Sequence, residues 1–137
     1  MDVGEKRVGV AVGDAEMKLA FELVTLEKDK EFAEKLAKLI EDQDVDVLII
    51  GLPITLAGIE RQQAKEIRDF SLKLRDKVKI PIEFQDERLS TVEAEKKLRQ
   101  TGASEAEIKS RIDQAAAAVI LQDYLDKNSN NQISNHK

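Results

Sequence analysis

The chain has 137 residues, of which 36% are charged, with a net charge of -5 and no cysteine. This length is enough for one compact domain but too short for two lobes around a cleft. The lack of cysteine excludes a disulfide framework and a thiolate zinc site, and the acidic balance means that any binding of nucleic acid requires a local basic surface.

The N-terminus lacks the apolar stretch of a signal peptide. The longest apolar run, residues 115–121, is far below the ~20 residues that span a bilayer. We therefore expect a soluble, cytoplasmic protein without a membrane partner.

The first half of the chain predicts two strands, a helix and a further strand. Valine alternates with glycine and alanine over residues 8–13, which is the period of a strand, and residues 20–26 fit a second strand across a hairpin. Apolar residues at helical spacing predict a helix over 29–42 with Asp29 as its N-cap. The near-continuous apolar run 45–52 is typical of a strand buried on both faces of a sheet.

The second half predicts a helix over about 60–77, a strand that begins at Pro81, and two more helices. These two helices begin with capping boxes, Ser90 with Glu93 and Ser104 with Glu107, and end near residues 100 and 125. The polar segment that follows lacks an apolar period. We therefore expect an ordered domain over residues 1–126 and a disordered tail over 127–137.

The order β-β-α-β-α-β-α-α predicts an α/β fold with a central mixed sheet flanked by helices, in which antiparallel N-terminal strands precede parallel strands. Ligands of such sheets bind at the carboxyl ends of the strands. Asp86, Glu87 and Arg88 lie at one of these ends and are candidates for a site. A charged strand end before a capped helix explains them equally well.

Strand alternation leaves the choice between the two acids open. It places Asp86 on the same face as the apolar Phe84, and Glu87 on the opposite face, which favours Asp86 as the inward residue. A bend at the junction with the next helix would remove this preference.

Asp113 shares a largely apolar helical face with Ala117 and Ile120. A carboxylate buried on such a face must be paired, protonated or bound to a cation. A position at the rim of the face, in water or paired with Lys109 or Arg111, explains the pattern equally well.

Asp2 precedes a Gly-containing turn and a strand, a pattern that is also common turn chemistry. The one histidine, His136, lies in the polar tail, so the sequence offers no Ser-His or Cys-His pair for catalysis. Carboxylate oxygens suit Mg²⁺ or Mn²⁺, and two such ions about 4 Å apart can activate a water for phosphodiester hydrolysis. Metal-dependent hydrolysis is therefore the candidate reaction.

Basic residues accompany the acids. The candidate phosphate contacts are Lys6, Arg7 and Arg88, next to the acids in sequence, and Arg61, Lys65 and Arg68, on one flank of a predicted helix. A solvated helix face with ordinary ion pairs explains the helix flank as well.

Four segments, DVGEKRVGVAVGD, IIGLP, DERLST and RIDQAAAAVILQDYL, give the chain a family resemblance over about residues 2–126. In their order and spacing it resembles the YqgF/RuvX family, whose members are named Holliday junction resolvases or pre-16S rRNA nucleases. The resemblance implies an RNase H-like fold and, as catalytic and metal-binding acids, Asp2, Glu87 and Asp113. It leaves Asp86 as a residue that could orient Arg88 or a ligand.

The function that the resemblance implies is an endonuclease, dependent on Mg²⁺ or Mn²⁺ and using two ions, that cleaves structured nucleic acid at the 5′ end of 16S rRNA precursors. A resolvase of branched DNA and a non-catalytic nucleic-acid-binding module are the alternatives. Both a monomer and a homodimer are compatible with the sequence.

The sequence departs from the family pattern in three places. Only Met1 precedes Asp2 where the family has an apolar strand, so we expect a truncated first strand, weak metal binding and little activity. The loop around Gly58 lacks the family's Asn- or Asp-Gly-Thr element, and Glu105 and Glu107 lie in a segment that is often basic. These two changes predict modest affinity for nucleic acid.

Overall fold

The computed structural model describes residues 1–55, 57–87 and 90–135, and the side chains as far as residue 128. Its elements, in chain order, are β1 (Asp2–Val3), β2 (Arg7–Asp14), β3 (Leu19–Glu27), α1 (Phe32–Asp42), β4 (Leu48–Pro53), α2 (Gln62–Val78), β5 (Ile82–Glu87), α3 (Ser90–Gln100) and α4 (Glu105–Asn135). The predicted order is confirmed, with a short strand added at the N-terminus.

The N-terminal residue joins two sets of strands into one layer. β1 pairs antiparallel with β2, β2 pairs antiparallel with β3, and β4 pairs parallel with β5. The α-ammonium of Met1 donates to the carbonyl of Ile49 (2.5 Å), and the N–H of Gly51 donates to the carbonyl of Met1 (3.0 Å). These two bonds place the two-residue β1 between β2 and β4, so the order of strands across the layer is 3-2-1-4-5.

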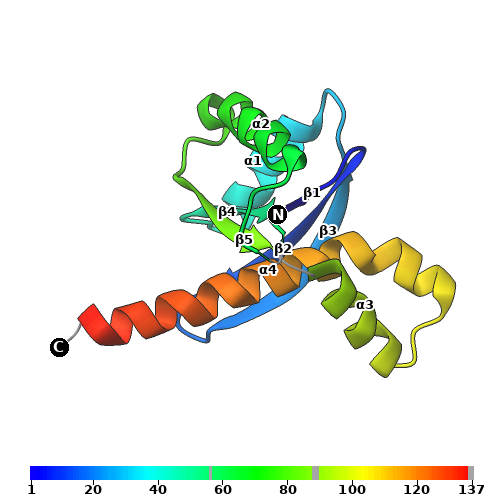
Figure 1. The fold of residues 1–137 in the computed structure, drawn as a ribbon. Coiled ribbons are helices and arrows are strands. Elements are labelled where there is room, and N and C mark those ends of the chain that lie inside the picture. Colours follow the sequence, from blue (N-terminus) through cyan, green and yellow to red (C-terminus); the bar gives the residue numbers. More distant parts are fainter. Residues whose placement is uncertain (56, 88–89, 136–137) are drawn as a thin grey trace.

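Helices cover both faces of this layer. Figure 1 shows α1 and α2 on one side of the strands, and α4, with α3 beside it, on the other. The larger apolar core lies on the α1 and α2 side and includes Val8, Leu36, Ile50 and Leu74. A second cluster, which includes Leu98 and the small Ala116, joins α3 to α4. None of the described helices is both long and apolar enough to cross a bilayer.

Close backbone contact between α4 and β2 sets the distance between this helix and the sheet. A Cβ added at Gly9 would lie 1.9 Å from the carbonyl oxygen of Asp113, so only glycine leaves room for the helix at this point. Ala116 and Ala117 are fully buried and keep the helix surface flat. These small residues therefore let α4 pack closely on the sheet, so that the backbone of Asp113 lies against β2.

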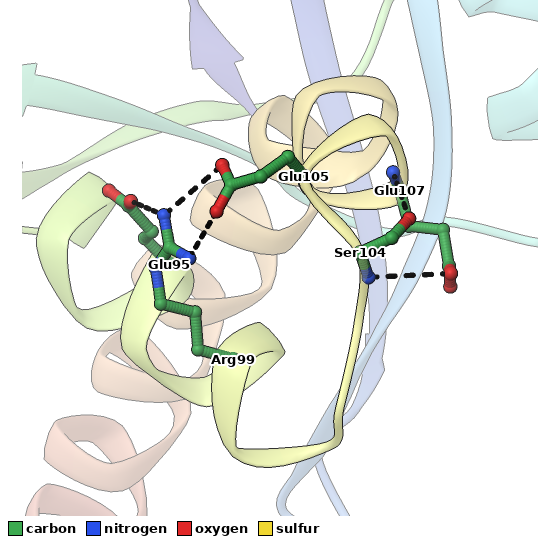
Figure 2. A network of polar contacts seen from close by, with 5 residues as sticks. All are labelled: Glu95, Arg99, Ser104, Glu105 and Glu107. Atoms are coloured by element: carbon green, nitrogen blue, oxygen red, sulfur yellow. Dashed lines mark hydrogen bonds and ion pairs between the residues drawn. The ribbon is translucent and has the colours of Figure 1, made fainter.

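The turn between α3 and α4 has the predicted chemistry (Figure 2). The N–H of Glu107 donates to Ser104 Oγ (3.2 Å), and the N–H of Ser104 donates to Glu107 Oε1 (3.4 Å), which confirms this capping box. Gly102 has a φ of 82°, as a glycine after a helix end requires. Arg99 adds contacts to Glu95 (2.8 Å) and Glu105 (2.5 Å), all on exposed side chains that stabilise little.

Two helix ends differ from the prediction. Asp29 does not cap α1, whose N-cap is Glu31; the carboxylate of Asp29 instead accepts the N–H of Glu31 (3.0 Å) in the preceding turn. α4 continues to Asn135, beyond the predicted end near residue 125, and so includes most of the segment predicted as a disordered tail. That segment contains no glycine or proline to end a helix. Residues 136–137 lie outside the described part.

We expect Gly9→Ala to lower the free energy of unfolding by about 1 to 3 kcal/mol or more, because the added methyl group meets backbone that cannot move without displacing α4. Chemical denaturation measures the change. Gly13→Ala is the matched control on the same strand, since a Cβ there would first meet movable methyl groups of Leu121 and Leu125 and would lie 3.1 Å from the nearest backbone atom, the carbonyl oxygen of Leu19. Equal losses in the two variants would contradict a special role for Gly9.

Candidate active site

Carboxylates from three elements lie on the α4 side of the sheet centre. Asp2 in β1 is paired with Gly9, the residue on which the backbone of Asp113 rests. Glu87 ends β5, and its Oε2 would lie 3.0 Å from a Cβ at Gly51, the residue that binds the carbonyl of Met1. The two glycines therefore place acids of β5 and α4 on either side of Asp2.

The pKa of Asp2 reflects the proximity of Glu87 and Asp113. Its pKa is raised from 3.8 to about 7, first by burial, then by the negative charge of Glu87, with a smaller contribution from Asp113. The α-ammonium of Met1 acts in the opposite direction. Asp2 therefore holds a proton for part of the time at neutral pH, and a cation placed between the acids would favour its release.

Strand alternation favoured Asp86 as the inward residue, but the structure buries Glu87 more deeply. Asp86 is exposed, whereas Glu87 is half-buried on the side that faces α4. The same side of β5 carries Glu83, whose carboxylate accepts a hydrogen bond from the hydroxyl of Tyr124 on α4 (2.8 Å). Alternation assigned the faces correctly, but helices cover both faces, so an apolar neighbour does not identify the side that holds the site.

Ser90 fixes the orientation of Glu87. Its hydroxyl, at the start of α3, donates a short hydrogen bond to Glu87 Oε1, and the serine is buried. The sequence marks Ser90 only as a helix-capping residue, so this contact was not predicted. The one available signal is its place three residues after the acid, which brings the first turn of a helix back over the strand end.

Asp113 is paired with a residue far away in the sequence. Arg7 Nε lies 3.3 Å from Asp113 Oδ2, with 54% and 31% of the two side chains exposed. The predicted alternative partner Arg111 donates instead to Glu22 (3.0 Å to Oε2 and 3.3 Å to Oε1). The positively charged guanidinium of Arg7 therefore lies at the rim of the group formed by Asp2, Glu87 and Asp113.

The donor chemistry fits a hard divalent cation, but the described side chains are not arranged around one. Within residues 1–55, 57–87 and 90–135, no group of three or more Asp, Glu, His or Cys side chains could hold a metal ion as it stands. Asp113 is bonded to Arg7 and Glu87 to Ser90. Both carboxylates would have to turn from these partners for all three acids to share an ion.

The basic residues predicted to contact phosphate lie at different places in the structure. The N–H of Arg61, the N-cap of α2, donates to the carbonyl of Pro53 (3.1 Å), which is aligned with Glu87, so Arg61 lies at the edge of the sheet that holds the acids. Arg68 pairs with Glu60 (2.5 Å) and lies over the ring of Phe84 (5.0 Å to its centre).

Lys6 and Lys65 are exposed. Arg88 lies outside the described residues.

A sheet of order 3-2-1-4-5 with helices on both faces, and with acids on the central strand β1, the parallel strand β5 and the last helix, defines an RNase H-like α/β protein. The model of the family described as "RuvX: Holliday junction resolvase" matches residues 1–127. The chain belongs to this family.

Relatives of similar length agree. A protein of Chloroflexus aurantiacus is 38% identical over 139 aligned positions, which cover 100% of this chain and 91% of the relative. Identity is 41% to a protein of Chloroflexus aggregans (95% and 93% covered) and 42% to one of Methylobacillus flagellatus (91% and 87% covered). Each of these proteins carries the name "Putative pre-16S rRNA nuclease".

We expect Asp2→Asn to stabilise the protein in metal-free buffer at about pH 8, by up to a few kcal/mol, and to change little at about pH 5. The folded protein binds the Asp2 proton more tightly than the unfolded chain, so its stability falls as the pH rises from about 4 to about 7 and stays low above. The asparagine removes this loss. Thermal unfolding in chelator across this pH range measures the difference.

The control for this prediction is Asp86→Asn, at an exposed position of β5. Burial lowers the pKa of the Met1 α-ammonium to about 6, which gives an opposite pH trend. The charge of Asp2 raises that pKa, so this trend differs between the two proteins, and the comparison is therefore made at about pH 8, where the α-ammonium of the folded protein is largely neutral. A destabilised Asp2→Asn variant at about pH 8 would show that the carboxylate makes a favourable contact in the folded protein.

Proposed function

We propose that this protein is a Mg²⁺- or Mn²⁺-dependent endonuclease that hydrolyses phosphodiester bonds in structured nucleic acid. One observation carries the proposal: the three acids assigned by resemblance come from β1, β5 and α4, yet the charges of Glu87 and Asp113 both raise the pKa of Asp2. Carboxylates that repel one another in this way gain from a shared cation. Membership of the RuvX family supports the same reaction class.

The proposed ligands of the metal ions are Asp2, Glu87 and Asp113. Two bound ions would activate a water molecule and stabilise the leaving oxygen. Ser90 orients Glu87 through its hydroxyl, and the rigid contact at Gly9 sets the height of Asp113 above the sheet. Asp86, exposed beside Glu87, remains a candidate for orienting Arg88 or a ligand.

Arg7 has a second role in this proposal. Its guanidinium neutralises Asp113 in the absence of substrate, and its side chain is half exposed. A phosphate group at the rim of the site presents oxygen atoms whose spacing matches that of the N–H donors of the guanidinium. Arg7 would then release Asp113 for the metal while it holds the substrate.

The substrate we propose is the precursor of 16S rRNA, cleaved at its 5′ end, as the names of the relatives suggest. This would place the protein in the cytoplasm. The description of the family favours a second candidate, a resolvase of branched DNA. Symmetric cleavage of a junction would require a homodimer with two sites, whereas a monomer suffices for an RNA end.

We expect Asp113→Asn to reduce Mg²⁺-dependent cleavage by more than about 100-fold. Loss of a residue that only orients a metal ligand lowers activity by about 10-fold to 100-fold, and loss of the ligand itself should lower it further. Stability in chelator should fall by no more than about 1 kcal/mol, since the pair with Arg7 is partly exposed. The assay uses a 16S rRNA precursor fragment and a four-way DNA junction, with and without Mg²⁺.

Asp123→Asn is the matched control, with the same substitution at an exposed position of the same helix. Cleavage of the junction alone would favour the resolvase. If the wild-type protein binds either substrate at saturating Mg²⁺ but does not cleave it, the protein is a non-catalytic binding module. Normal cleavage by Asp113→Asn would remove this residue from the proposed site.

We expect replacement of Arg61, Lys65 and Arg68 by glutamine to weaken binding of nucleic acid and to lower its log–log salt slope by up to about 0.7 to 0.9 for each lost phosphate contact. Fluorescence anisotropy at several salt concentrations measures the slope. The matched control replaces Lys73, Arg75 and Lys77 near the other end of α2, with the same change in charge. Equal slopes in the two triple variants would contradict a phosphate-binding role for the first set.

A further inference from the structure

The turn that follows β4 presents an apolar side chain next to the candidate active site. Ile59 is 66% exposed, more than any other large apolar side chain among the described residues. A single exposed apolar residue is common on protein surfaces and means little by itself. The significance of Ile59 therefore depends on how firmly the turn holds it and on what lies around it.

Hydrogen bonds close the turn around Ile59. The N–H of Thr55 donates to the carbonyl of Ile59 (2.8 Å), and the N–H of Gly58 donates to the carbonyl of Thr55 (2.9 Å). The N–H of Ile59 donates in return to the hydroxyl of Thr55 (3.2 Å). Gly58 has a φ of 85°, which residues with a Cβ rarely adopt. These contacts fix the backbone that carries Ile59.

The turn is anchored to the end of the strand that carries Glu87. The N–H of Ile54 donates to the carbonyl of Glu87 (3.1 Å), and Ile54 forms an antiparallel bridge with Glu60. Thr55 and Ile59 are the next pair outward, so Ile59 lies about two strand positions, or ~7 Å, beyond Glu87. Stacked nucleotides rise about 3.4 Å each, so this distance is about two base steps.

Strand alternation places Ile59 on the side of the sheet that holds the acids. Glu60 pairs with Arg68 of α2 (2.5 Å), and α2 covers one face of the sheet (Figure 1). Successive residues of an extended segment point to opposite faces. Ile59 therefore points to the other face, which α4 covers and on which Glu87 is half-buried.

The surroundings of Ile59 suit a nucleobase better than a protein surface. Its exposed neighbours among the described residues of the turn are Ala57, Gly58 and Glu60, so the apolar surface is one large side chain wide. A stable protein interface needs about 800 Å² from each partner, far more than this side chain offers. Arg61, two residues later, is an exposed cation that a phosphate can approach. A nucleotide combines a phosphate with a flat apolar ring of matching size.

We propose that Ile59 packs against the face of a nucleobase within about two nucleotides of the scissile phosphate, so that the protein selects nucleic acid whose base stacking is interrupted there. Isoleucine is among the apolar side chains that insert between base steps. A continuous duplex covers both faces of each internal base and offers Ile59 no contact. The inference rests on the proposed nuclease function and names the structural class of its substrate.

The test compares a continuous duplex with the same duplex carrying one unpaired 2-aminopurine nucleotide, each made as RNA and as DNA. Binding is measured by fluorescence anisotropy with Ca²⁺ in place of Mg²⁺, and a gel confirms that the nucleic acid stays intact. We expect the wild-type protein to bind the interrupted duplex about fivefold to thirtyfold more tightly in at least one of the two backbones. The fluorescence of 2-aminopurine should rise on binding as the base leaves the stack.

Ile59→Ser should bring the ratio of the two affinities close to one, remove the fluorescence change and leave binding of the continuous duplex unchanged. Ile59→Leu should keep the preference, because it keeps the apolar contact. Leu72→Ser is the matched control, since Leu72 is 58% exposed on α2. All three variants change exposed side chains, so equal melting temperatures are expected and show that folding is intact.

Three results would overturn the inference: no preference in the wild-type protein, an unchanged preference in Ile59→Ser, or an equal loss in Leu72→Ser. Cleavage of the same nucleic acids in Mg²⁺ is measured separately. A preference that depends on Ile59 without any cleavage would refute the proposed nuclease and support recognition of an interrupted stack by Ile59. Cleavage without the preference would overturn this inference alone.

Discussion

The two hydrogen bonds of Met1 to β4 join the two sets of strands into one layer. They connect the antiparallel strands β1 to β3 with the parallel pair β4 and β5, which otherwise share no ladder among the described residues. The same contacts bury the charged N-terminus, and burial lowers the pKa of its α-ammonium to about 6. Burial also raises the pKa of Asp2 to about 7, so the sheet centre disfavours charge on both groups.

The acids and the packing depend on each other. Gly9 and Gly51 have no side chains, so the backbone of Asp113 and the carboxylate of Glu87 can approach the sheet on the side of Asp2. Larger residues at either glycine would separate the acids and relieve their repulsion. The protein thus keeps unfavourable charge at a site where ordinary packing would remove it. The central strand β1 links the packing of the sheet to the candidate site, because its residue Asp2 lies near both Glu87 and Asp113.

Much of the fold followed from local patterns. The alternation of valine with small residues in β2, the apolar run of β4 and the capping box at Ser104 each gave an element near its observed position, because they depend on residues close in sequence. The end of α4 was misplaced, since polar residues without glycine or proline do not stop a helix.

The sequence by itself determined the element order and the family, and through the resemblance it named the candidate acids. Only the tertiary structure decided between faces and partners: Arg7 rather than Lys109 or Arg111 beside Asp113, Ser90 on Glu87, and the α4 side rather than the α1 side of β5. These choices join residues from different elements, such as Arg7 and Asp113. No periodicity along the chain records them, because they are fixed by how closely α4 can approach β2 at Gly9.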